Sequence, residues 1–447
     1  MVKRFSPDVL DHDRTYRETL LGIAGRALDA VDPETSVQRV LSLSESGLRV
    51  GTHSVSMAGI DRCVVLGFGK AALGMGRGVV AQLGDLPMSG ILISNEIGTV
   101  PPFEVLAAAH PIPDAKGVTA GRRLLEYAGS VGAKDLVIVL ISGGGSALLT
   151  VPAAGLRLQD ISATNAALLR CGAPIAEVNT VRKHLSAVKG GRLAKAIVGA
   201  GAIVTLVLSD VVGNPLDAIA SGPMVADRTS FADALKVLDL YDIRSDMPEA
   251  VLRHLDAGAR DEIAQNPTTG ILFETHVIEI VADASIAADA AVDAATQAGY
   301  VASVVTSNLE GEASDVGRQI VKDAATLRPG EMSVYAGETT VTVRGSGVGG
   351  RNQELALAAA IELDGSEGLV ILALGTDGID GMTPSAGAFG DGSTVARGRD
   401  AGLDAADHLT RNDSHTFLHV IRDTVNCGPT GTNVGDLIIV YRTGAGL

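Results

Sequence analysis

Two glycine-rich stretches of the sequence each lead to a single basic residue at the expected start of a helix. In "VRGSGVGGRNQELALAAAI" (343–361) the glycines end at Arg351, and in "GFGKAALGMG" (67–76) they surround Lys70. A cation is unfavourable there, because the N-terminus of a helix carries partial positive charge. An anion bound between the two helix starts would remove both misfits. A solvent-exposed side chain is the alternative for Lys70.

Backbone N–H groups at glycine turns provide a second means of binding anions. Gly67 and Gly69 allow the backbone to approach an anion closely, and "ISGGGSALL" (141–149) places three consecutive glycines before a helix. A structural turn seldom needs three, so we expect this stretch to bind phosphate or carboxylate. The expected cradle consists of Ser142, Gly143, Gly144, Gly145 and Ser146. The spacing of the glycines in 67–76 matches neither the dinucleotide-binding pattern nor the P-loop.

A cationic stripe is expected in "VNTVRKHLSAVKGGRL" (178–193). On a helix, Arg182, Ser186 and Lys189 would share one face. They would contact an anionic substrate or cofactor, or else form a solvated face paired with acidic residues. His184 lies off this stripe and is expected to be a satisfied helix histidine. His110 in "HPIPD" is best explained as part of a proline turn, with a ligand contact as the alternative.

Carboxylates follow several expected strands. Asp210 ends "AIVTLVLSD" (202–210), where it would take a proton from a substrate hydroxyl, hold a metal ion or simply form a turn. Asp377 and Asp380 in "GTDGIDG" would hold Mg²⁺ through water or bind sugar-like hydroxyls, and Glu338 is a further candidate. Anion cradles, separate cations and carboxylates together suit phosphoryl transfer. The residues alone indicate binding of a phosphorylated small molecule.

The elements that carry these residues indicate two α/β domains. Strands without period-2 alternation alternate with helices, which predicts a Rossmann-like parallel sheet with helices on both faces over residues 1–257. A smaller, mixed α/β domain is expected over 258–447, opening with a strand near 276–282 and containing a hairpin over 332–345. Ligands of open α/β sheets bind at the carboxyl ends of the strands, where these motifs lie.

Composition excludes several classes of function. The chain has 447 residues, a net charge of −16 and 46% hydrophobic residues, which argues against nucleic-acid or membrane partners and against disorder. The cysteines show no metal or redox spacing, and we find neither a signal peptide nor an apolar run of membrane-spanning length. A cytoplasmic location is the simplest expectation. A homodimer is an arrangement that the sequence leaves open.

The motifs resemble the glycerate 2-kinases of the MOFRL type over nearly the whole chain. The likeness rests on the stretches 141–149, 178–194, 209–223, 337–358, 374–381 and 428–437, in the family's order. It implies ATP-dependent phosphorylation of D-glycerate at the 2-hydroxyl, giving 2-phosphoglycerate and ADP, with Mg²⁺ or another divalent cation. It also implies an active site in the cleft between two α/β domains. Phe68 and Gly435 depart from the family pattern as we expect it.

The resemblance also assigns residues. Lys70 and Arg351 would flank the transferring phosphoryl group, with Asp210 orienting or deprotonating the hydroxyl. Substrate or phosphate binding is expected of Gly67, Gly69, Ser142, Gly143, Gly144, Gly145, Ser146, Asn179, Arg182, Lys189, Gly350, Asn352, Asp377 and Asp380. Asp210 and Glu338 are the expected metal ligands. The alternatives are a glycerate kinase that forms 3-phosphoglycerate, an NAD(P)-dependent hydroxypyruvate reductase and a non-enzymatic binding protein for an acidic sugar.

Overall fold

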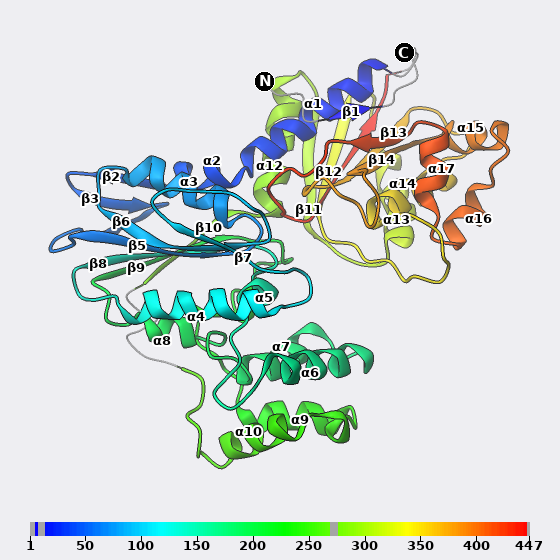
Figure 1. Cartoon of the computed structure of the whole chain (residues 1–447). Coiled ribbons are helices and arrows are strands. Elements are labelled where there is room, and N and C mark those ends of the chain that lie inside the picture. The colour runs from blue at the N-terminus through cyan, green and yellow to red at the C-terminus, as the bar shows by residue number, and fades with distance from the viewer. Residues whose placement is uncertain (1–4, 8–13, 269–275, 445–447) are drawn as a thin grey trace. The chain divides into compact units, whose positions relative to one another are not determined.

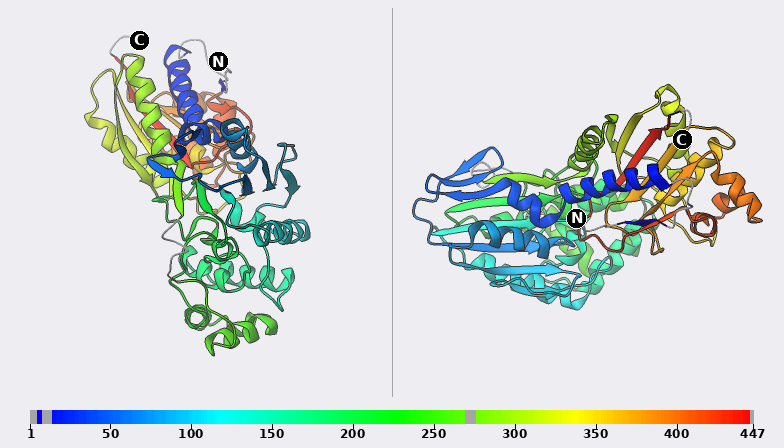
Figure 2. Two further views of the ribbon diagram at one scale, coloured as in Figure 1. Left: turned by 90° about the vertical axis from the view of Figure 1, so that its left-hand side faces the viewer. Right: turned by 90° about the horizontal axis from the view of Figure 1, so that it is seen from above.

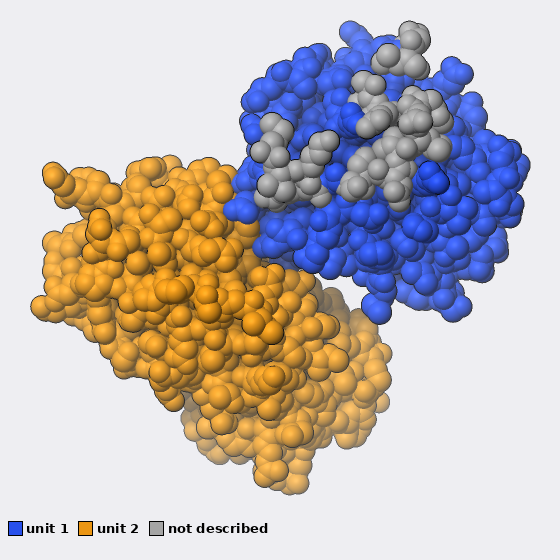
Figure 3. All heavy atoms as spheres, turned by 45° about the horizontal axis from the view of Figure 1, so that its top comes forward, with its two compact units in different colours: residues 1–32, 210–213, 282–447 blue, residues 33–209, 214–281 orange. Residues whose placement is uncertain are grey.

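The computed structural model describes residues 5–7, 14–268 and 276–444. Two compact units divide the chain, and Figure 3 colours them separately. Unit 1 comprises residues 1–32, 210–213 and 282–447, and unit 2 comprises residues 33–209 and 214–281. In the part of the chain that is described, no helix is both long and apolar enough to cross a membrane.

These units differ from the boundary expected after residue 257 at three places, the first being the short stretch 210–213, which belongs to unit 1. Helix α1 (Arg14–Ala30) belongs to unit 1, where it packs beside α12 (Ala284–Gln297), as both views of Figure 2 show. Strand β10 (Val277–Ala282), expected to open the second domain, instead lies next to β9 (Ala202–Leu208) in the sheet of unit 2. The placements of α1 and β10 arise from tertiary pairing that local sequence patterns do not encode.

Unit 2 is built on a six-stranded sheet in the order β10-β9-β8-β5-β6-β7. The pairs from β9 to β7 are parallel, which confirms the expected parallel sheet. The bounds of its remaining strands are β5 (Arg62–Phe68), β6 (Met88–Ser94), β7 (Glu104–Ala107) and β8 (Asp135–Ile141). Figure 1 shows α2 (Pro33–Val40) and α3 (Ala72–Leu83) on one face, with α4 (Ala115–Gly129) and α8 (Arg192–Ala196) on the other. A separate small sheet contains β2 (Leu41–Ser44), β3 (Gly47–Val50) and β4 (His53–Val55).

A group of helices extends unit 2 on one side of this sheet (Figure 1). It contains α6 (Leu158–Arg170), α7 (Ile175–His184), α9 (Phe231–Leu240) and α10 (Glu249–Ala259), which share an apolar core around Phe231. His184 is fully buried, pairs through Nδ1 with the Thr180 carbonyl at 2.8 Å and packs edge-on against Phe231. His184 is therefore a buried helix histidine as expected, but it is only half satisfied, because its buried Nε2 has no hydrogen-bond partner among the described residues.

Unit 1 contains a seven-stranded sheet in the order β1-β15-β14-β13-β16-β12-β11. Its strands are β1 (Ser6–Pro7), β11 (Val301–Leu309), β12 (Glu331–Gly337), β13 (Leu369–Gly375), β14 (Gly387–Asp391), β15 (Thr424–Asn426) and β16 (Asp436–Arg442). Strands β11 and β12 are parallel, whereas β16 runs antiparallel to both β12 and β13. The mixed character that we expected is thus confirmed.

The hairpin expected over 332–345 is wrong. Strand β12 ends at Gly337, and residues 341–350 form neither strand nor helix. The reason is that β12 has its two neighbours elsewhere in the chain, in β11 and β16, so both of its edges are already paired. The residues after Gly337 turn away instead, and Thr339 donates its N–H and hydroxyl to Asp436.

Helices cover both faces of this sheet. The bounds of α13 are Ala313–Asp323 and those of α14 are Arg351–Glu362; α15 (Thr394–Asp400), α16 (Ala405–Thr410) and α17 (Ser414–Val420) follow later in the chain. Alternate side chains of the strands contribute to two apolar cores. One core holds α1 and α12, and the other holds α13, α14 and α17.

A buried ion-pair cluster fastens α1 to this unit. Arg17 is only 2% exposed and contacts Asp391 at 3.1 Å and Asp423 at 2.8 Å. Arg397 pairs with Asp423 as well, and the Arg17 guanidinium lies over the ring of Phe389. Removing one partner of a buried pair is costly, because the remaining charge stays buried.

We therefore expect Arg17→Met to lower the free energy of unfolding by about 3 kcal/mol. Urea unfolding followed by circular dichroism measures this change. Arg26→Met is the matched control, because Arg26 lies on the same helix with its side chain exposed. Equal destabilisation by the two substitutions would contradict the assignment.

Candidate functional site

The two glycine stretches of unit 2 pack directly on each other. Gly69 follows β5 with a φ of +125°, and a Cβ there would lie 2.2 Å from Ser142 Oγ. The Lys70 N–H donates to the Gly143 carbonyl at 2.9 Å, and the Ala71 N–H donates to Ser142 Oγ at 3.0 Å. The Ser142 hydroxyl therefore binds the chain at the start of α3, and this contact fixes the position of Lys70.

Lys70 lies beside His110 and the turn at Gly144. Gly144 has a φ of +79° at the start of α5 (Gly145–Leu148), and a Cβ there would lie 2.8 Å from His110 Cδ2 and 3.4 Å from Lys70 Cγ. Burial and the charge of Lys70 lower the pKa of His110. Among the described residues no carboxylate pairs with Lys70. No local pattern places His110, which is distant in the chain, next to this lysine.

A pocket of about 210 Å³ opens beside Gly144 and His110. It is lined by His110, Pro111, Pro113, Gly144, Ser146, Ala147, Thr150, Val151, Pro152, Ile161, Asn165, Arg182, Leu185, Ser186 and Lys189. Arg182 donates from Nε to Asn165 Oδ1 at 2.8 Å, and Lys189 donates from Nζ to the Ser146 carbonyl at 2.6 Å. Apolar side chains form most of the remaining wall.

The stripe of Arg182, Ser186 and Lys189 comes together, but not on a helix. Helix α7 ends at His184, so the expected single helical face is wrong. Beyond it the chain turns, and Ser186 Oγ accepts the Val188 and Lys189 N–H groups at 3.2 and 3.3 Å. Local side-chain bonding of this kind competes with helix formation.

The two cations of the pocket lack acidic partners in the described part of the chain. Lys189 is 6% exposed, and burial, together with the charge of Arg182, lowers its pKa to about 7. Burial also lowers the pKa of Arg182. The alternative of a solvated face paired with acidic residues is not what the structure has.

Asn179 belongs to a buried polar chain behind this pocket. The Ser221 hydroxyl lies 3.1 Å from Asn179 Oδ1 and 2.9 Å from the Ser146 hydroxyl. Ser221 and Ala220 both have positive φ, which is costly for residues other than glycine and often accompanies functional sites. Asn179 is thus linked to Ser146 through a serine that the sequence did not point out.

The depressed pKa of Lys189 predicts a pH dependence of stability. The unfolded chain keeps this proton to about its ordinary pKa of 10.5, whereas the folded chain releases it near 7. Because the unfolded state then binds more protons, raising the pH between these values favours folding. We expect the stability difference between the wild type and Lys189→Met to rise from pH 7 to pH 10 in buffer without multivalent anions. A flat difference in urea unfolding would contradict the shift.

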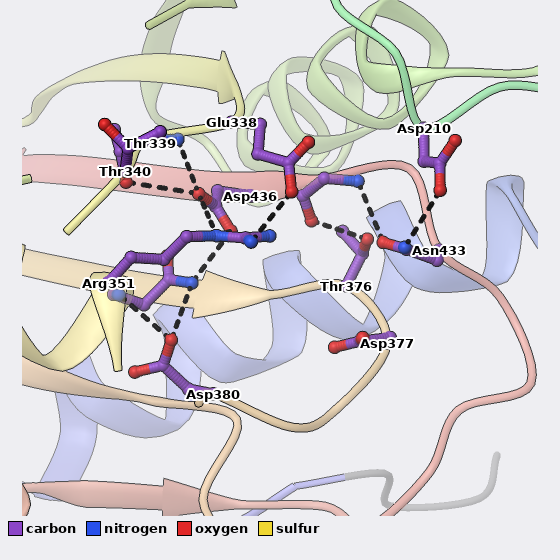
Figure 4. A network of polar contacts seen from close by, with 12 residues as sticks. Asp210, Glu338, Thr339, Thr340, Arg351, Thr376, Asp377, Asp380, Asn433 and Asp436 are labelled. Carbon is purple, nitrogen blue, oxygen red and sulfur yellow. Dashed lines mark hydrogen bonds and ion pairs between the residues drawn. The ribbon is translucent and has the colours of Figure 1, made fainter. Parts of the chain in front are cut away.

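In unit 1, Arg351 is held between two carboxylates at the start of α14 (Figure 4). Its Nε donates to both oxygens of Asp436 at 2.9 Å, and its Nη1 contacts Glu338 at 2.8 Å. The Asp436 side chain is fully buried, and Arg351 keeps 31% of its side chain exposed. Burial opposes the charge of Arg351, but Asp436 and Glu338 outweigh it and raise the pKa. Protein carboxylates therefore offset the cation at this helix start, where we had expected a bound anion.

The glycines before Arg351 serve close packing within the protein. A Cβ on Gly345 would lie 2.2 Å from the Arg411 carbonyl oxygen, and one on Gly347 would lie 2.4 Å from Asp413 Cβ. At Gly350 a Cβ would lie 2.4 Å from Asp380 Cγ. The expected role of these glycines in approaching a phosphate is therefore not supported at these positions.

Asp380 anchors the start of α14. Its carboxylate accepts the N–H groups and the side-chain amides of Asn352 and Gln353 at 2.9 to 3.3 Å. Asn352 also donates to Asp436 at 2.8 Å, so the two carboxylates share it. Burial raises the pKa of Asp380. Asp380 and Asn352 thus position Arg351.

Asp210 and Asp377 lie near the polar network of Arg351, to which Glu338 belongs (Figure 4). Asn433 donates to Asp210 at 3.4 Å, and Asp377 Oδ1 accepts the Ile379 N–H at 3.1 Å. Within the described residues no group of three or more His, Cys, Asp or Glu side chains could hold a metal ion. Mg²⁺ often uses only one or two carboxylates together with substrate phosphates. Burial raises the pKa of Glu338, and repulsion from Asp436 and Asp210 adds to it. Carboxylates are the ligands that Mg²⁺ takes from proteins, so the chemistry of Glu338 and Asp210 fits a divalent cation.

The departure at Gly435 has a structural reason. Gly435 has a φ of +89°, and a Cβ there would lie 2.3 Å from the Gly337 carbonyl oxygen. Phe68 is fully buried and packs near Gly145. Asp436 was missed because nothing in its local pattern separates it from an ordinary strand residue.

Two family models match the chain. Residues 19–256 match the domain of unknown function DUF4147, and residues 331–436 match the MOFRL family. A glycerate 2-kinase of Pyrococcus horikoshii is 38% identical over 96% of this chain and 97% of its own length. A protein of Agrobacterium vitis, whose name provisionally assigns hydroxypyruvate reductase activity, is 39% identical over 95% of this chain and 94% of its own length.

A solved structure agrees with this relationship. The crystal structure of glycerate kinase from Thermotoga maritima is 36% identical, with a TM-score of 0.84, and the likeness covers 96% of this chain and 100% of that chain. Identity at this level over nearly the full length defines the class of protein. The chain belongs to the MOFRL-type glycerate kinase family.

Proposed function

We propose that this protein transfers the γ-phosphoryl group of ATP to the 2-hydroxyl of D-glycerate, giving 2-phosphoglycerate and ADP. The observation that carries the proposal is the nearly full-length similarity to the glycerate 2-kinase of P. horikoshii. The contents of the sites support it, because phosphoryl transfer relies on positioned cations and carboxylates.

The two cations that follow glycine turns are assigned to charge neutralisation. Lys70 of unit 2 has no carboxylate partner among the described residues, so its charge is available to phosphate. Arg351 of unit 1 is positioned by Asp436 and Glu338 and keeps part of its side chain exposed. Such preorganised charges stabilise the transition state without reorganising during the reaction.

In the transfer step, the 2-hydroxyl oxygen forms a bond to the γ-phosphorus. The bond between that phosphorus and the β–γ bridging oxygen breaks, and ADP leaves with the bonding electrons. Asp210 is assigned to orient the hydroxyl and accept its proton. The backbone of 142–146, Gly67, Gly69 and Asp377 is assigned to contact phosphate or substrate. Asn179, Gly350, Asn352 and Asp380 are assigned to positioning, since their groups already bind or pack against other parts of the protein.

Asp210 and Glu338 are the residues that would hold a divalent cation. Bound there, Mg²⁺ would neutralise phosphate charge. Glu338 would then share its negative charge between the metal and Arg351.

We expect Lys70→Ala and Arg351→Lys each to lower turnover by on the order of 10²-fold or more. Arg351→Lys keeps a charge beside the buried Asp436, so loss of activity is separable from loss of folding. ADP release with D-glycerate, measured through coupling enzymes, reports the turnover. The controls are Lys195→Ala, at an exposed position, and Arg318→Lys, where the side chain is 39% exposed and pairs with Asp315. Turnover near the wild-type value in either test variant would remove that residue from the mechanism.

The position of the new phosphate ester tests the reaction itself. We expect the ³¹P spectrum of the product to match 2-phosphoglycerate, and a match to 3-phosphoglycerate would overturn the assignment. The name of the A. vitis relative favours one further assay, NADH oxidation with hydroxypyruvate in the absence of coupling enzymes. Oxidation there without glycerate-dependent ADP release would replace the kinase with a reductase.

A further inference from the structure

The pocket beside Gly144 carries two positive charges that no carboxylate among the described residues balances. Arg182 and Lys189 both line it, and in the described residues neither pairs with a carboxylate. Elsewhere in unit 2 a buried lysine is treated differently, since Lys183 lies 3.6 Å from both Asp217 and Asp227. Two like charges held together out of water are costly unless an anion joins them.

Both cations are held in place by the surrounding chain. Asn165 accepts from Arg182 Nε, which leaves the terminal guanidinium nitrogens without a hydrogen-bond partner among the described residues, and the Ser146 carbonyl accepts from Lys189 Nζ. Ser186 fixes the turn from which Lys189 projects. These contacts orient the donors but do not neutralise them, because amide, hydroxyl and carbonyl oxygens carry no net charge.

The size and the position of the pocket restrict its occupant. At about 210 Å³ it falls below the usual range for drug-sized ligands and is too small for a whole nucleotide. A three-carbon acid fits. His110 and Gly144 line the pocket, and both lie beside Lys70. An acid bound here would therefore place its far end on the Lys70 side.

We propose that Arg182 and Lys189 bind the carboxylate of the acceptor substrate, so that this pocket selects a short hydroxycarboxylic acid. The inference rests on the proposed kinase function and names the part of the site that recognises glycerate. Arg182 supplies the planar donors that suit a carboxylate. Lys189 supplies a second charge that the bound anion stabilises, and the apolar wall limits the length of the acid.

Steady-state kinetics with the full chain test this proposal. Arg182→Gln should raise the KM for D-glycerate by about 10- to 100-fold, the loss expected for a charge-assisted hydrogen bond, with the KM for ATP within about twofold. Lys189→Met should act in the same direction, and Arg182→Lys should restore part of the loss. Arg170→Gln is the matched control, because Arg170 is exposed at the end of α6. Thermal unfolding verifies that each variant is folded.

Calorimetry without nucleotide separates this inference from the proposed function. D-Glycerate should bind the wild type and lose affinity in Arg182→Gln, whereas glycerol, which lacks the carboxylate, should not bind. An increase in the KM for ATP alone would make the pocket a phosphate site and overturn the proposal. Tighter binding of inorganic phosphate than of glycerate in the titration would do the same. An unchanged glycerate affinity in both variants would overturn it too. If the wild type releases no ADP, the kinase assignment fails, and the glycerate titrations still decide the pocket.

Discussion

The bond between Arg351 and Asp436 is the interaction on which the rest of unit 1 depends. A fully buried carboxylate without a partner would be strongly destabilising, and a guanidinium at a helix start opposes the helix dipole. Each group corrects the misfit of the other. Asn352 links the same carboxylate to Asp380, which holds the helix start, so the position of the guanidinium is set before any ligand arrives. A phosphate would then meet a cation that is already oriented and partly exposed.

Unit 2 treats its cations in the opposite way. The Arg182 side chain donates to an amide oxygen and the Lys189 side chain to a backbone carbonyl. In the described residues no carboxylate pairs with either of them or with Lys70. Their charge is thus balanced only when an anion is present, and the folded protein tolerates the imbalance, partly because the pKa of Lys189 falls to about 7. One unit therefore positions a cation permanently, and the other keeps its cations available. Binding energy for an acidic substrate is expected chiefly from the second arrangement.

Much of the fold followed from local patterns, and the exceptions share one cause. Apolar runs marked β5, β8, β9, β13 and β16, because buried strands need them whatever they pair with. The ion pair of Arg351 joins residues 85 positions apart, and no local pattern around Asp436 indicates it. The placement of α1, the sheet membership of β10 and the contact of His110 with Gly144 are likewise tertiary. The helix expected through Lys189 is absent for a different reason, because Ser186 Oγ accepts a backbone N–H that the helix would otherwise use.

The glycines show how a sequence pattern can locate an accurately positioned cation for a partly wrong reason. Gly144 lies in the left-handed region beside His110 and Lys70, so any side chain there would collide with the site itself. Gly345, Gly347 and Gly350 instead admit backbone and side chains of their own unit. In both stretches glycine removes a Cβ so that a neighbour can approach, and only the identity of that neighbour differs. A glycine run before a basic residue is therefore evidence that the cation is placed accurately, and phosphate contact by the run must be established separately.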